Sequence, residues 1–239
     1  MSTRLAALEG AAPHATLSAL RENIDRIDDA LLALMEERLD CSLAVASLKG
    51  KDEGEKQLYL RPEREQQIID RLAARARLLR PDGIADIWRA LMSVSLQAQQ
   101  KVELAIHAER RAVLVTDSAR RRFGNSARLE SAATAAQALA RAQARDAIAI
   151  IELNPMSDWW TFREDHQGLV LFDTLRDKRG GIVAVAIGRV PRENLPPTDD
   201  ILMVRTASEL RERTEAGDPI RALAMHGDER LCLLEGSGR

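Results

Sequence analysis

Apolar residues recur at spacings of three and four from Leu17 to Val45, and this pattern predicts a long amphipathic helix. The helix is expected to end near Gly50, because residues 51–56 are charged or glycine and are typical of a loop. A helix of about 30 residues spans roughly 45 Å, and no other predicted helix is long enough to cover its apolar stripe. The pattern therefore favours a partner helix from a second copy of the chain.

Two shorter helices are predicted after this loop, over about 62–80 and 84–106. Pro62 suits the first turn of a helix. Pro81-Asp82-Gly83 then interrupts the chain and separates the two helices. The first part of the chain is therefore expected to be an all-helical domain of three helices.

Beyond residue 108, short apolar runs separated by turns replace the helical pattern. Helices are predicted at 131–144 and about 208–215. The predicted strands are Val113–Val115, Ala147–Leu153, Leu169–Phe172, Ile182–Ile187, Ile201–Val204, Ile220–Met225 and Leu231–Leu234. This alternation predicts an α/β or α+β layer domain.

The predicted fold class is α + α/β. A three-helix domain that forms an intertwined dimer is followed by a smaller α/β (or α+β) domain. The predicted boundaries are a flexible tail at 1–16, the helical domain at 17–108 and the accessory domain at 109–239. A length of 239 residues agrees with two domains.

The charge balance, the cysteine content and the lengths of the apolar runs exclude several classes of partner and cellular location. Lys and Arg number 35 against 37 Asp and Glu, so neither a nucleic acid nor an anionic membrane is indicated as a partner. The two cysteines lie far apart, which favours a reducing compartment without structural zinc. No apolar run approaches a membrane span or a secretory signal, so a cytoplasmic protein is expected.

Eight polar residues along the helical part are candidates for a pocket that binds a small dicarboxylate: Arg21, Arg38, Lys49, Arg61, Arg64, Glu65, Ser95 and Gln99. Arg21 and Arg38 are separated by roughly 25 Å along one helix, so a second copy must close such a site. Each residue could instead be a solvated or polar position of a helix bundle. Ser95 and Gln99, however, interrupt the most apolar face of their helix, and inward polar groups need partners.

Three segments carry a resemblance to a known family. They are LRENIDRIDDALLALMEER at 20–38, LYLRPERE at 58–65 and SVSLQAQQ at 93–100. In order and spacing they resemble the all-helical class of chorismate mutase, best known as the amino-terminal domain of the bifunctional chorismate mutase–prephenate dehydratase. The resemblance covers about a third of the chain.

The resemblance implies a homodimer that rearranges chorismate to prephenate on the route to phenylalanine and tyrosine, with no metal or other cofactor. It implies that Arg21 of the other subunit and Arg38 grip the two carboxylates, with Ser95 as a further carboxylate contact. Lys49 and Gln99 resemble the donors to the ether oxygen. Glu65 resembles the acceptor for the ring hydroxyl, beside Arg64.

Arg61 departs from the family pattern, because relatives often have an acidic residue there, and this puts the contact of that residue in doubt. Residues 108–239 contain neither the Thr-Arg-Phe triplet of prephenate dehydratases nor the Glu-Ser-Arg-Pro signature of their sensor domain. Two alternatives stay open: a bifunctional mutase whose second domain processes prephenate in a divergent way, and a non-catalytic sensor of an aromatic metabolite. Trp159 and Trp160 are expected to pack in a core, or else to line a pocket or interface.

Overall fold

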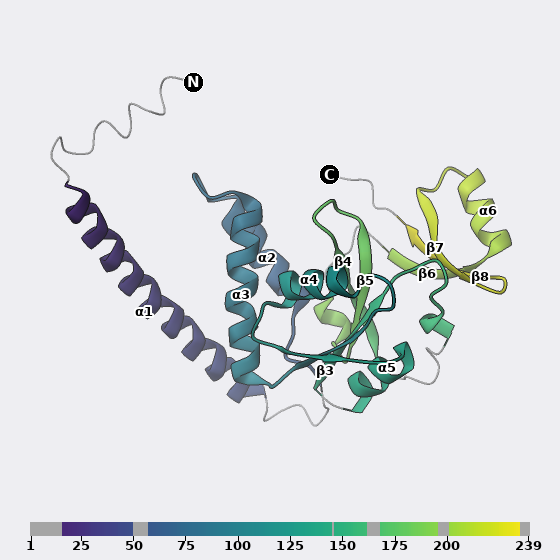
Figure 1. Cartoon of the computed structure of the whole chain (residues 1–239), viewed down its shortest axis with the longest axis horizontal. Coiled ribbons are helices and arrows are strands. Elements are labelled where there is room, and N and C mark those ends of the chain that lie inside the picture. The colour runs from purple at the N-terminus through teal and green to yellow at the C-terminus, as the bar shows by residue number, and fades with distance from the viewer. Residues whose placement is uncertain (1–15, 50–56, 145, 162–167, 196–200, 235–239) are drawn as a thin grey trace, which may run out of the picture. The chain divides into compact units, whose positions relative to one another are not determined.

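The structure is a computed structural model that describes residues 16–49, 57–144, 146–161, 168–195 and 201–234 (Figure 1). The chain divides into two compact units, Met1–Leu48 and Lys49–Arg239. The predicted tail lies outside the described residues except for Thr16, and so does the predicted loop at 51–56.

The first unit contains one long helix, α1 (Leu17–Lys49), as the spacing of apolar residues predicted. Several apolar side chains of its stripe are exposed. The exposed members include Leu17, Leu20, Ile24, Ile27, Leu31, Leu34, Met35, Leu43 and Val45. Helices of this kind are stabilised mainly by packing of the apolar face, so α1 requires a partner surface.

Two helices open the second unit, α2 (Pro62–Ala73) and α3 (Pro81–Gln99). Both are shorter at the carboxyl end than predicted. The residue before α3 is extended, and a proline occupies the first turn of each helix, where its missing N–H costs nothing.

The strand β1 (Glu103–His107) occupies residues that we predicted as the end of the third helix. Val102, Leu104 and Ile106 belong to the apolar cluster on one face of the sheet, and Ala105 belongs to the cluster on the other. This two-residue period is that of a strand. The sheet thus begins before the predicted domain boundary, and the α/β part is longer than the helical part rather than smaller.

The helix α4 (Ala112–Phe123) includes residues 113–115, so the strand predicted there is wrong. Val115, Ala119 and Phe123 are buried at intervals of four, whereas Val113 is 86% exposed. Three successive β-branched or apolar residues favour a strand locally. The longer helical period, which buries one face against the sheet, overrides that preference.

Five strands form a mixed sheet in the order β2-β1-β3-β5-β4. β1 is parallel to β2 and β3, whereas β5 is antiparallel to both β3 and β4. The other four strands are β2 (Arg128–Ser131), β3 (Ala147–Glu152), β4 (Val170–Arg176) and β5 (Ile182–Gly188). The last three overlap predicted strands, and β3 is buried along its whole length, which agrees with its apolar sequence from Ala147 to Ile151.

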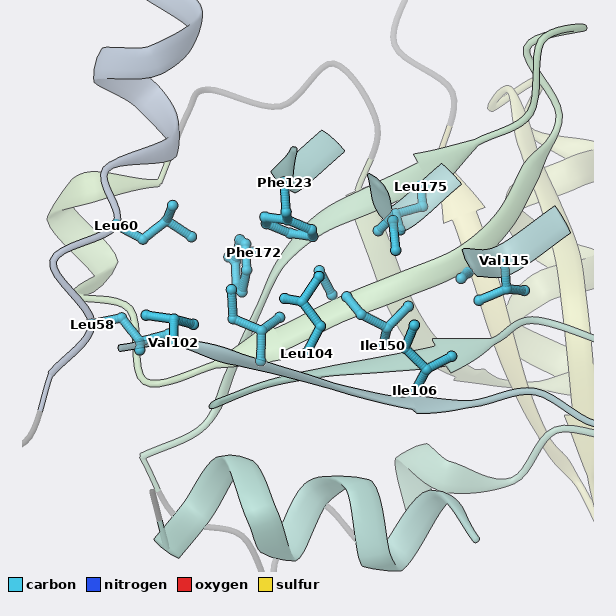
Figure 2. Packing of buried hydrophobic residues seen from close by; sticks show 14 of the residues in the cluster. Leu58, Leu60, Val102, Leu104, Ile106, Val115, Phe123, Ile150, Phe172 and Leu175 are labelled. Carbon is cyan, nitrogen blue, oxygen red and sulfur yellow. The ribbon is translucent and has the colours of Figure 1, made fainter. Parts of the chain in front are cut away.

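Helices cover both faces of this sheet. Val115, Ala119 and Phe123 of α4 pack on one face, and Ala138, Leu139 and Ala142 of α5 (Ala135–Ala144) pack on the other. Figure 2 shows the α4 side, where Phe123 lies beside Phe172 above the strands. The two rings meet edge to face with centroids 6.1 Å apart.

The segment that leads into α2 belongs to the same core. Leu58 and Leu60 are 4% and 3% exposed and lie with Val102 and Phe172 in Figure 2. The Leu58 N–H donates to the Arg189 carbonyl at 2.9 Å. The helical and α/β parts of the second unit therefore share one hydrophobic core.

A second, antiparallel sheet has the order β6-β8-β7. Its elements are β6 (Ile201–Thr206), α6 (Ala207–Glu215), β7 (Ile220–His226) and β8 (Glu229–Leu234), and a short 3-10 turn (Arg192–Asn194) precedes it. Trp159 and Trp160 are buried in one cluster with Ala224 and Leu231 of this sheet and with residues of the larger sheet. Of the alternatives for these tryptophans, core packing is the one observed.

Glu152 ends β3 with a side chain that is 1% exposed. One carboxylate oxygen accepts the backbone N–H groups of Glu109, Arg110 and Arg111 at 2.8, 2.9 and 3.2 Å, and the other accepts Nε of Arg111 at 3.1 Å. Burial alone would raise the pKa of Glu152, but these donors outweigh it and lower the pKa. The carboxylate thus binds the turn that leads into α4 and lies near the amino-terminal end of this helix, where a negative charge is favourable; we call this arrangement the buried Glu152 cap.

Gly124, which follows α4, provides the first stability prediction. Its φ is 73°, and an added Cβ would lie 2.6 Å from Ser93 Cβ of α3. Gly217 has a φ of 86° with no atom within 4 Å of such a Cβ, so it is a matched control. We expect Gly124→Ala to lower the free energy of unfolding by about 1–3 kcal/mol more than Gly217→Ala in urea titrations. Equal losses would contradict a close α3–α4 contact.

Candidate functional site

The candidate residues of the first unit lie on α1. Arg21 is exposed and Arg38 is partly buried, and this burial lowers the pKa of the Arg38 guanidinium. Because α1 is one continuous helix, these two residues cannot reach one small molecule from the same chain. Lys49 is the last residue of α1, but the position of its side chain is outside the described part of the structure.

The candidates on α2 separate into two groups. Arg61 and Arg64 are exposed near the start of the helix. Glu65 lies on the partly buried side with Pro62 and Ile69. Its carboxylate therefore meets other parts of the fold, whereas the two arginines meet solvent in the single chain.

Glu65 is paired with Arg122 of α4. Nη1 of Arg122 donates to Oε2 of Glu65 at 2.8 Å, and each side chain is 16% exposed. Nε of Arg122 also donates to Oδ2 of Asp173 on β4. We call these three residues the α2–α4–β4 ionic triad.

The charge of Arg122 is stabilised by its neighbours. Burial opposes the charged form, but the two carboxylates outweigh this effect and raise the pKa of Arg122 above its ordinary value. The guanidinium also lies 5.0 Å from the ring centroid of Phe123. Sequence analysis missed Arg122, because three successive arginines at the end of a helix give no sign of which one turns toward the core.

Ser95 and Gln99 lie on α3. Ser95 is 5% exposed, and its hydroxyl donates to the Leu91 carbonyl at 3.1 Å. Gln99 is partly buried at the last residue of the helix. The prediction that these polar residues point inward agrees with their burial.

A cavity of about 350 Å³ lies between α2, α3, α4 and β4. Both signs of charge line it, with Glu65, Asp86, Arg89, Arg122 and Asp173 among the lining residues. Burial and the nearby Arg122 lower the pKa of the Arg89 guanidinium. Of the eight predicted site residues, Glu65 is the one that lines this cavity, as far as the described residues show.

Within the described residues, no group of three or more His, Cys, Asp or Glu side chains is placed to hold a metal ion. None of the helices in the described ranges is long and apolar enough to cross a membrane.

Comparison with known proteins gives a match over the helical part. Residues 20–100 match the family described as chorismate mutase type II. A similar curated protein is the bifunctional chorismate mutase/prephenate dehydratase of Pseudomonas aeruginosa, 35% identical over 92 residues. The match covers 37% of this chain and 25% of that protein, so the chain spans about a quarter of the length of this relative. No solved structure matches the chain.

Proposed function

We infer that this chain, whose residues 20–100 match the chorismate mutase type II family, is a chorismate mutase that converts chorismate to prephenate in aromatic amino acid biosynthesis. The observation that carries this proposal is the family match, which contains Arg21, Arg38, Lys49, Ser95 and Gln99 together with the pair Arg64-Glu65. Order and spacing of these residues support the same conclusion as the match.

The reaction suits a site built from cations and hydrogen-bond donors. In the rearrangement a carbon–oxygen bond breaks while a carbon–carbon bond forms within one molecule. The protein has to hold a flexible dianion in its compact reactive shape and place donors where negative charge grows on the ether oxygen. Guanidinium groups bind carboxylates through two parallel hydrogen bonds, which fixes orientation as well as charge.

The residue roles follow from this chemistry and the family pattern. Arg38 binds one carboxylate and Arg21 of a second subunit binds the other. Lys49 and Gln99 donate to the ether oxygen, and Glu65 accepts the hydrogen bond of the ring hydroxyl. Ser95 is a further carboxylate contact, Arg64 shapes the charge field beside Glu65, and the backbone of Arg61 can serve the hydroxyl side of the substrate.

The assembly that we propose is a homodimer paired through α1. The apolar stripe of α1 is exposed in the single chain, and 33 residues give a helix of roughly 50 Å. A second α1 has the length and the apolar face that can cover this stripe. If the two α1 helices run antiparallel, this pairing places Arg21 of one subunit near Arg38 of the other, which α1 alone cannot do.

In this proposal the mutase site is built on residues 17–108, although β1 within this range belongs to the sheet, and residues 109–239 form the accessory part. Although the relative's name includes prephenate dehydratase, the match to it covers 92 residues. Phenylpyruvate formed from chorismate without acid treatment would reveal a second activity on prephenate.

The direct test is conversion of chorismate by the full-length protein without added cofactor. We expect chorismate absorbance to fall and prephenate to appear in equal amount. Because Gln99 donates without having to be protonated, the rate should persist from neutral to mildly alkaline pH. No prephenate from a folded protein would favour the sensor alternative, and a rate that collapses above about pH 6 while the fold is intact would contradict the role of Gln99.

A further inference from the structure

The α2–α4–β4 ionic triad joins a proposed substrate residue to the α/β part of the chain. Glu65 lies on α2, whereas Arg122 and Asp173 come from α4 and β4. The Glu65 and Arg122 side chains are each 16% exposed and that of Asp173 is 26% exposed. An ion pair shielded to this degree is screened less by salt than a surface pair and is held in a defined geometry.

The orientation of the Arg122 guanidinium is fixed by its packing against neighbouring side chains. Arg122 lies against the Phe123 ring, and Phe123 packs edge to face on Phe172 in the core shown in Figure 2. Asp173 follows Phe172 on β4 and binds Nε of Arg122, while Nη1 remains for Glu65. The guanidinium fork therefore connects α2 to the sheet in one orientation.

One oxygen of the Glu65 carboxylate, Oε1, remains available to accept a hydrogen bond from a ligand. Arg122 binds Oε2, and no described residue donates a hydrogen bond to Oε1. A carboxylate oxygen that is ionised and fixed in direction is a strong acceptor for a hydroxyl group. The pairing with Arg122 thus orients the Glu65 carboxylate and leaves its Oε1 atom able to accept a further hydrogen bond.

We propose that Arg122, held by Asp173, is a positioning residue for the mutase reaction, which orients the Glu65 carboxylate toward the ring hydroxyl of the substrate. This inference rests on the proposed function and extends it, because it assigns the α/β part a role in catalysis. Residues 109–239 then complete the geometry of the mutase site, in addition to stabilising the fold.

The test compares kcat/KM for chorismate between full-length variants. Arg122→Met removes the charge and keeps an unbranched side chain, and we expect kcat/KM to fall about tenfold or more because Glu65 loses its orientation. Arg122→Lys keeps the charge and should restore part of the loss. The matched control is Arg120→Met, since Arg120 is an exposed cation of the same helix, and its kcat/KM should stay within about twofold of wild type.

A double-mutant cycle distinguishes two roles of Arg122: orienting the Glu65 carboxylate, or only holding α2 against the sheet. In a Glu65→Gln chain, Arg122→Met should change kcat/KM by less than about twofold, because no carboxylate remains to be oriented. A docking contact alone would lower kcat/KM by the same factor whether residue 65 is Glu or Gln. Equal factors would therefore overturn the inference.

If Arg122→Met does not fold, as judged by circular dichroism, Asp173→Asn replaces it, because that change keeps the shape and removes the carboxylate that holds Arg122. We expect kcat/KM to fall by about threefold, again only while Glu65 is present. An unchanged kcat/KM overturns the positioning role and leaves the mutase assignment intact. A wild-type chain without mutase activity overturns the proposed function and this inference with it.

Discussion

Replacing Arg38 by Ala is expected to lower kcat/KM for chorismate by about 10²–10³-fold, the effect seen when a preorganised donor is removed from an active site. The guanidinium is partly buried on α1, and in the proposed role it binds a carboxylate of the substrate through two parallel hydrogen bonds, which an alanine cannot form. Arg26→Ala is the matched control, because it removes an exposed cation from the same helix. Similar losses in both variants would contradict a specific role for Arg38.

The same variant tests the composite site. When an Arg21→Ala chain and an Arg38→Ala chain are unfolded together and refolded, half of the dimers are mixed, and each mixed dimer has one intact site and one doubly altered site. Random pairing should therefore restore about a quarter of wild-type activity. Either variant refolded alone should remain inactive. Activity that is not restored, although mixed dimers form, would show that both arginines act within one chain or act elsewhere.

Glu152→Ala is expected to lower the free energy of unfolding by about 3–5 kcal/mol, the range for breaking a buried charge pair. The change leaves three backbone N–H groups before α4 and Nε of Arg111 without their acceptor, whereas Nη2 of Arg111 still donates to the Leu153 carbonyl. Glu130→Ala is the control, since its pair with Arg128 is on the surface. Urea unfolding of both variants gives the comparison, and losses of equal size would contradict the buried cap.

The pH dependence of this cap has a definite sign. The folded pKa of Glu152 is lowered, so the unfolded chain binds the extra proton first as the pH falls. The stabilisation is complete above the unfolded value of about 4.3 and is lost as the pH falls through the folded pKa. Wild type should therefore lose its advantage over Glu152→Gln on acidification from about pH 5. A constant difference between the two proteins down to pH 3 would contradict this.

The sequence predicted those elements in which one pattern extends over many residues. α1 has its apolar spacing over 33 residues, β5 is an unbroken apolar run, and β3 is apolar up to Ile151. The failures occur in short runs, at 103–107 and 113–115. In five residues or fewer the periods of helix and strand are hard to distinguish, and contacts with the sheet decide which conformation is stable.

The candidate site divides in a similar way. Sequence pattern and resemblance select Arg38, Glu65 and Gln99, because their order and spacing along the predicted helices resemble the family pattern. The partner of Glu65 could not be predicted, since Arg122 is distant in sequence and meets it only after α4 packs on the sheet. Long-range ion pairs of this kind depend on tertiary structure, so the local preference of a sequence for helix or strand does not predict them.

The burial of Leu58 and Leu60 against the sheet also bears on how such chains can evolve. If a gene rearrangement joined residues 20–100 to an unrelated domain, these two leucines would lose the sheet that buries them. An exposed apolar patch would then lie beside α2. Residues 20–100 of this chain therefore depend on the sheet for the cover of these leucines, and we expect the two parts to be inherited together.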